Sequence, residues 1–211
     1  MIQRTALRFP GTDEDVARLR ILLTDALRTA DFQASGRLAV LNLACGRADE
    51  SGALAAAVTP AEIGFYLGID LRPDAIEEAA SRWHLADGEI EFICGDASAT
   101  HRMKQLPPVD LVFIRHQNYW SEPAVWDRLL GNALAALKPD GVLVLTSYFD
   151  VEHDLMIAAL KTRGAVLVAN LRHFKSRPLS DAPGKSVDRH LAVFRRSGER
   201  TFLLGSGFVQ K

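Results

Sequence analysis

The amino-acid sequence predicts an α/β fold in which helices cover both faces of a mostly parallel sheet. Apolar runs of strand length alternate with segments of helical periodicity. The runs are almost continuously apolar, as strands buried on both faces are. The last two runs, 165–171 and 190–195, have no helix between them, which predicts a C-terminal antiparallel strand.

The length of the chain favours a single domain. Its 211 residues can bury a full core, and we expect an N-terminal arm and helix over 1–35, the core over 36–196 and a tail over 197–211. The N-terminus lacks the apolar region of a signal peptide, and no apolar run approaches the roughly 20 residues of a membrane span. These features predict a cytoplasmic protein with no membrane partner. Cys45 and Cys94 fit neither a disulfide nor a zinc spacing, so we expect reduced thiols.

Charge is distributed unevenly along the chain. From position 151 to the end, eleven Lys or Arg residues stand against five Asp or Glu, a charge of +6 that leaves −7 for the remainder of a chain of net charge −1. A solvated, charged hairpin accounts for this excess without a partner, and an acidic or nucleic-acid partner is the alternative. The basic residues of this segment include Arg172, Lys175, Arg177, Lys185, Arg189, Arg195 and Arg196.

The first predicted helix begins at Thr12, a good N-cap residue that three acidic residues follow. Apolar residues then recur at helical spacing as far as Ala30. Such a helix either packs on the flank of the sheet or covers a ligand crevice.

The next elements alternate between strand and helix. Residues 50–58 are rich in alanine, and Pro60 prevents that helix from continuing. Pro73 suits the first turn of the next helix, whose apolar stripe ends at Trp83. The expected order is strand 38–43, helix 50–58, strand 65–70, helix 73–83, strand 90–94, short helix 97–106, strand 109–114, helix 121–137, turn 138–141, strand 141–146 and helix 153–163.

The loop after the first strand is the clearest candidate site. An apolar strand ends at Asn42-Leu-Ala-Cys-Gly-Arg-Ala, and helix formers follow from Glu50. Small side chains let a ligand approach the backbone, and the start of a helix offers unpaired N–H groups. This pattern predicts a nucleotide or nucleoside site.

Two acids end later strands, where ligands of open α/β sheets lie. Asp70 is placed to accept hydrogen bonds from the hydroxyls of a ribose, and its alternative role is to cap the helix at Pro73. Asp96 is placed to accept a hydrogen bond from an adenine amine, and an N-cap role is equally compatible with its position.

A polar and aromatic cluster, 115–120, follows the strand 109–114 directly. Loops at this edge of a sheet often carry function, although capping and packing would also explain the cluster. His116 is the candidate base because histidine titrates near neutral pH, and its alternative role is a hydrogen bond to the backbone. Arg115 suits a cofactor or an acidic substrate, and Tyr119 and Trp120 suit the wall of an acceptor pocket.

Five motifs in order resemble those of class I S-adenosylmethionine-dependent methyltransferases over roughly residues 36–196. They are Asn42-Leu-Ala-Cys-Gly-Arg-Ala, Gly68-Ile-Asp70, Gly95-Asp96-Ala97, Asp110-Leu-Val-Phe and Leu137-Lys-Pro-Asp-Gly141-Val-Leu-Val. The resemblance implies a doubly wound, Rossmann-like, seven-stranded sheet and S-adenosyl-L-methionine as the cofactor. It implies contacts of 44–46 with the methionine part, of Asp70 with the ribose, and of Asp96 and Ala97 with the adenine. The predicted cofactor-binding residues are Asn42, Ala44, Cys45, Gly46, Asp70, Leu71, Asp96, Ala97 and Arg115, with His116 as the catalytic residue and no metal ligand.

The first motif departs from the family pattern. The family usually has an acid where Asn42 stands and glycines where Ala44 and Ala48 stand. An amide loses the negative charge that favours the ammonium group of the cofactor, so we expect weaker cofactor binding.

The favoured function is methyl transfer to a small molecule, because the chain has little room for a separate recognition domain. One alternative is an RNA or protein methyltransferase that uses the basic hairpin. The other is a non-catalytic protein that binds S-adenosylmethionine. A nicotinamide-dependent dehydrogenase is disfavoured because the first loop lacks G-x-G-x-x-G, and the six histidines lack the spacing of metal ligands.

Overall fold

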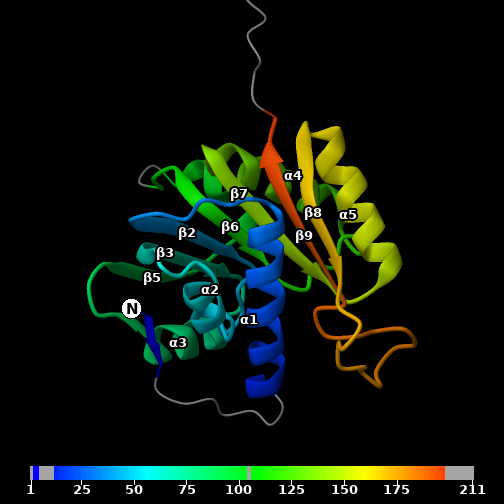
Figure 1. Ribbon diagram of the computed structural model, residues 1–211, viewed down its shortest axis with the longest axis horizontal. Helices are drawn as coiled ribbons and strands as arrows, with labels where there is room; N and C mark the ends of the chain where they lie inside the picture. Colours follow the sequence, from blue (N-terminus) through cyan, green and yellow to red (C-terminus); the bar gives the residue numbers. More distant parts are fainter. Residues whose placement is uncertain (1, 5–11, 104–105, 198–211) are drawn as a thin grey trace, which may run out of the picture.

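A seven-stranded sheet with helices on both faces forms the centre of the computed structural model, which describes residues 2–4, 12–103 and 106–197 (Figure 1). The strand order is β5-β3-β2-β6-β7-β9-β8. Neighbouring strands from β5 to β7 are parallel, whereas β9 is antiparallel to both β7 and β8. The fold class predicted from the sequence is therefore confirmed. In sheet order the strands are Glu89–Cys94, Glu62–Asp70, Arg37–Leu43, Val109–Ile114, Leu137–Ser147, His190–Arg196 and Ala165–Arg172.

The helices cover the sheet in two layers. Helices α1 (Thr12–Thr29), α2 (Ser51–Ala57) and α3 (Pro73–Arg82) contribute to one apolar cluster. Helices α4 (Pro123–Ala136) and α5 (Asp150–Thr162) contribute to the other. Successive side chains of a strand point to opposite faces, so Val40 of β2 joins the first cluster and Leu41 the second. No helix among the described residues is both long and apolar enough to span a membrane.

The strand order places the loops after β2 and β6 side by side. The chain moves outward from β2 through β3 to β5 and then returns to β6 on the other side of β2. Leu43 of β2 pairs with Ile114 of β6, so the residues that follow these two strands leave the sheet together. Such a reversal of strand order opens a crevice at the carboxyl ends of the strands.

Three predicted elements differ from the structure. Trp83 does not end a helix but begins β4 (Trp83–Leu85), which pairs with β1 (Ile2–Arg4). The predicted helix 97–106 is a 3₁₀ helix over Ala97–Arg102. The predicted turn 138–141 lies within β7, where the pairing with β6 shifts between Val109 and Leu111 and so accommodates the extra residues.

The predicted first helix is confirmed, and it has both of the roles that its sequence left open. Leu19 and Leu23 are fully buried against the sheet, while Thr12 and Asp15 at its start lie at the cavity described below. Of the predicted arm, residues 5–11 lie outside the described ranges, as do residues 198–211 of the predicted tail.

Candidate cofactor and acceptor site

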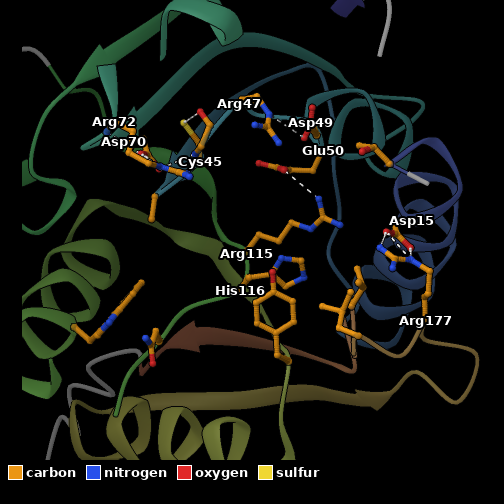
Figure 2. A pocket seen from close by; sticks show the side chains of 18 residues that line it. Asp15, Cys45, Arg47, Asp49, Glu50, Asp70, Arg72, Arg115, His116 and Arg177 are labelled. Atoms are coloured by element: carbon orange, nitrogen blue, oxygen red, sulfur yellow. Dashed lines mark hydrogen bonds and ion pairs between the residues drawn. The ribbon is translucent and has the colours of Figure 1, made fainter. Parts of the chain in front are cut away.

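A cavity of about 590 Å³ lies at the carboxyl ends of β2, β3 and β6 (Figure 2). Its size is typical of small-molecule sites, which run from about 300 to 1,000 Å³. The start of α1, the loop after β2, the ends of β3 and β6, and residues 177–187 before β9 all contribute to its wall. Segments far apart in the sequence thus meet at the edge of the sheet where ligands were expected.

The loop after β2 turns sharply through left-handed backbone conformations. Ala44, Gly46 and Ala48 have φ angles of 53°, 54° and 51°. Hydrogen bonds from Cys45 N to Ile69 O, at 3.1 Å, and from Ala48 N to Cys45 O, at 2.8 Å, hold the turn. This conformation favours glycine, and an alanine there costs about 1–2 kcal/mol. The two alanines therefore keep the conformation at a cost in stability.

We predict that Ala44→Gly raises the free energy of unfolding by about 0.5–1 kcal/mol, because relief of the strained backbone exceeds the added flexibility of the unfolded chain. Ala55→Gly in α2 is the control, since a helical glycine should instead destabilise by about 1 kcal/mol. Urea denaturation measures both changes. Equal destabilisation by the two substitutions would contradict the assignment of strain to Ala44.

Asp70 joins the loop after β2 to the end of β3. Its carboxylate accepts hydrogen bonds from Gly46 N at 2.7 Å and from Arg72 N and Nε, each at 3.0 Å. Burial alone would raise the pKa of Asp70, but these donors bring it below its ordinary value. The alternative capping role is not observed, because no side chain caps α3 and Arg72 is its N-cap residue. Since the Arg72 side chain is 65% exposed, a ligand hydroxyl can displace it from the carboxylate.

Asp188, just before β9, organises the two predicted residues that follow β6. Its oxygens accept hydrogen bonds from Arg115 Nε at 3.0 Å, Arg115 Nη2 at 2.7 Å and Thr146 Oγ1 at 2.9 Å. His116 Nε2 lies 2.8 Å from Asp188 Oδ1. Burial opposes ionisation, yet Arg115 and His116 hold the pKa of Asp188 well below its ordinary range. Nothing in the local sequence distinguished Asp188, which lies in the polar segment before the last strand.

His116 is poised as a neutral imidazole. Its ring stacks on Tyr148 with centroids 3.9 Å apart. Burial lowers the pKa of His116 below its ordinary value, although Asp188 acts in the opposite direction. Asp188 N–H is placed to donate to Nε2 at 3.2 Å, which is the backbone contact named as the alternative role of His116, and Asp188 Oδ1 lies closer to the same nitrogen, at 2.8 Å. We assign the proton of the neutral ring to Nε2 because it then satisfies the shorter contact. Nδ1 then has the free lone pair.

The floor of the cavity contains Glu50, which sequence reasoning took as the first residue of a helix. Asn42 lies beneath it, fully buried, and does not line the cavity, contrary to expectation. Asn42 Nδ2 donates to Glu50 Oε1 at 2.6 Å and to Tyr66 Oη at 2.8 Å. Asn42 therefore supports a carboxylate that does reach the cavity.

The other predicted residues divide into two groups. Ala44, Cys45, Gly46, Asp70, Arg115 and His116 line the cavity. Leu71 is 70% exposed outside it, and Ala97 is buried in the second apolar cluster. Asp96 accepts a hydrogen bond from Ser98 N at 2.8 Å, which is the capping role.

The predicted wall of the acceptor pocket also needs correction. Tyr119 donates to Asp127 at 2.9 Å, and Trp120 packs against Phe149 with centroids 5.1 Å apart. Neither lines the cavity, whereas Trp126 and Tyr148 do. The sequence predicted that Tyr119 and Trp120 would line the pocket because they follow the strand 109–114 closely. The aromatic side chains that do line the cavity come from α4 (Trp126) and from the residue after β7 (Tyr148).

The fold is Rossmann-like, with a cavity of small-molecule size at the carboxyl ends of its parallel strands. Residues 40–141 match the family model of the methyltransferase domain. This match supports the resemblance of the motifs to class I S-adenosylmethionine-dependent methyltransferases, a family whose cofactor is S-adenosylmethionine.

Solved structures with low sequence identity share the fold. The PH0226 protein from Pyrococcus horikoshii OT3 has a TM-score of 0.62 and 18% identity, with 92% of this chain and 95% of that chain covered. An S-adenosylmethionine-dependent methyltransferase from Clostridium acetobutylicum ATCC 824 has a TM-score of 0.61 and 12% identity, with 87% and 92% covered.

A curated relative is similar over part of its length. The mRNA cap guanine-N(7) methyltransferase 1 of Arabidopsis thaliana is 32% identical over 124 residues, which cover 51% of this chain. The match spans 32% of that protein's length, so about two thirds of the relative has no counterpart in the alignment.

Proposed function

We propose that this protein transfers the methyl group of S-adenosylmethionine to a small polar molecule. One observation carries the proposal: Gly46, Asp70 and His116, which contacts Asp188, line a single cavity. The first loop fits a cofactor because Ala44, Cys45 and Gly46 have small side chains or none and line the cavity.

The residues of this chain would orient the reactants and accept a proton. The cofactor supplies a methyl group that its sulfonium already activates, so alignment and exclusion of water are the main tasks of the protein. Residues 44–46 would hold the methionine part and Asp70 the ribose hydroxyls. His116 would take the proton of an acceptor hydroxyl or amine at Nδ1, while Asp188 stabilises the resulting imidazolium.

The wall of the cavity supports a small acceptor. Asn118, Trp126, Tyr148 and Leu179 combine apolar area with a few polar groups. Burial raises the pKa of Tyr148 to about 12, so its hydroxyl keeps its proton and can donate a hydrogen bond at neutral pH.

The basic segment supports a nucleic-acid partner less well than the cavity supports a small acceptor. Arg177 pairs with Asp15, and Arg189 pairs with Asp150 at 2.7 Å. Arg172 also contacts Asp150, and Lys185 contacts Asp181 at 2.6 Å. Much of the positive charge is therefore balanced within the protein, as a solvated hairpin would require.

An RNA acceptor is the second candidate. The similarity to the cap guanine-N(7) methyltransferase of Arabidopsis thaliana favours it.

A structural neighbour of 16% identity is a methyltransferase in complex with the Haloferax volcanii Trm112 activator, which makes an activator protein a further candidate partner.

A labelling experiment separates these acceptors. The protein is incubated with S-adenosylmethionine labelled in its methyl group, together with a fractionated extract of small molecules, protein-free RNA or capped RNA. We expect label in the small-molecule fraction. Label in RNA would favour the second candidate, and binding of the cofactor without transfer to any acceptor would favour a non-catalytic protein.

We predict that His116→Asn lowers kcat by about 10²–10⁴-fold, the usual contribution of a general base. Asparagine is the matched substitution because His116 has a φ of 59°, a conformation that asparagine tolerates. Because the pKa of His116 is below its ordinary value, the wild-type rate should rise with pH and be half-maximal at a pH below about 6.5. A pH–rate profile checks both points. An unchanged rate in the variant would exclude His116 as the base.

A further inference from the structure

Glu50 is a buried carboxylate that faces the cavity. The residue is 3% exposed, yet it lines the cavity beside Cys45 and Gly46. Oε1 accepts a hydrogen bond from Asn42 Nδ2 at 2.6 Å, and Oε2 lies 3.5 Å from Arg115 Nη1. Figure 2 shows Glu50 and Arg115 pointing toward each other from different segments of the chain. Besides its own backbone N–H, the Glu50 carboxylate therefore has one short hydrogen bond, from a neutral amide, and one long contact with a cation.

Arg115 is committed elsewhere. Arg115 donates hydrogen bonds from Nε and Nη2 to Asp188 at 3.0 and 2.7 Å. Most of the positive charge of Arg115 is therefore balanced by this other buried carboxylate. Two buried carboxylates thus share one guanidinium. An incompletely balanced buried charge is costly, and a cationic ligand would offset that cost. Burial raises the pKa of Glu50 above its ordinary value, and the opposing effects of Arg115 and Asn42 do not cancel this rise.

We propose that Glu50 binds the ammonium group of the methionine part of S-adenosylmethionine. This inference rests on the proposed function. An ammonium group has three N–H donors and no acceptor, which suits a carboxylate whose second oxygen has only a long contact with a cation. Glu50 stands next to the loop 44–46, which would hold the same part of the cofactor.

Asn42 acquires a defined role in this arrangement. Its amide donates to Glu50 and thereby fixes the carboxylate, whereas an aspartate at position 42 would place a second negative charge within hydrogen-bonding distance of the first. The acid that the first motif lacks at position 42 is supplied by the helix start eight residues later. The motif is altered, but the floor of the cavity keeps one carboxylate.

The test compares two ligands that differ in one amine. S-adenosylhomocysteine carries the ammonium group, and its desamino analogue keeps the carboxylate, thioether and adenosine. We expect the wild-type protein to bind S-adenosylhomocysteine at least about 10-fold more tightly, the lower range for a hydrogen bond to a charged group. In Glu50→Gln this preference should fall to about 2-fold or less, with the affinity for the desamino analogue little changed. Isothermal titration measures the four affinities.

The control is Asp110→Asn, which removes one negative charge at the opposite end of the sheet, where Asp110 pairs with Lys138. It should keep the wild-type preference. A Glu50→Gln variant that folds and retains the preference would overturn the inference while leaving the proposed function intact. Equal wild-type affinity for both ligands would overturn it even if Glu50→Gln does not fold. Binding of neither ligand would reject the proposed function, and this inference with it.

Discussion

Asp188→Asn is expected to lower the free energy of unfolding at pH 7 by about 3–5 kcal/mol, the usual effect of removing one partner of a buried ion pair. Asp188 is 1% exposed and balances the buried guanidinium of Arg115. Asparagine keeps the shape of the side chain and tolerates the φ of 48° at this position, so the change isolates the lost charge. Methyl transfer should fall as well, because Arg115 and His116 both lose their common partner.

The effect of Asp188→Asn should depend on pH. Because the folded protein holds the pKa of Asp188 well below its ordinary value of about 3.9, the carboxylate stabilises the fold fully above that value. Its contribution is lost as the pH falls toward the folded pKa, so the difference between wild type and variant should shrink below about pH 4.

Denaturant titration at several pH values measures this difference. The control is Thr146→Val, which removes one neutral donor from the same carboxylate and should cost about 1 kcal/mol. If Asp188→Asn were as stable as the wild-type protein at pH 7, Asp188 would not be balancing a buried charge.

Asp70→Ala is expected to weaken the binding of S-adenosylhomocysteine by at least about 100-fold. Two hydrogen bonds from ribose hydroxyls to a carboxylate contribute about 1.5–3 kcal/mol each. The substitution also removes the acceptor that fixes Gly46 N at 2.7 Å, so the first loop loses its tie to β3. Both effects act on the cofactor and not on the acceptor.

Titration calorimetry checks the Asp70 prediction. Asp74→Ala is the matched control, because Asp74 is an exposed acid in the first turn of α3 and does not line the cavity. It should bind like the wild-type protein. Equal affinities of Asp70→Ala and Asp74→Ala would show that the carboxylate of Asp70 does not contact the cofactor.

The sheet could be predicted from the sequence because its strands are buried on both faces and their apolar runs are continuous. The failures have physical causes. Trp83 fits the apolar stripe of α3, but its extended conformation depends on pairing with β1, about 80 residues earlier in the chain. The segment 138–141 has turn-forming residues, yet β7 runs through it with a shift in register.

The site could be predicted where it follows directly from strand ends. Asp70, Arg115 and His116 each come after an apolar run, and all three line the cavity. Asp188 reaches His116 from 72 residues away because the last hairpin folds back along β7, and no local pattern encodes that contact. Glu50 was missed because an acid at a helix start usually has a local explanation, the favourable interaction with the helix dipole.

Titration of the wild-type protein with S-adenosylhomocysteine is the most direct test of the account, because the proposed roles of Asp70, Glu50 and His116 all require the cofactor to bind in this cavity. We expect saturable binding at one site per chain, competition by S-adenosylmethionine, and at least about 100-fold weaker binding in Asp70→Ala. No detectable binding of either ligand to the folded protein would contradict it.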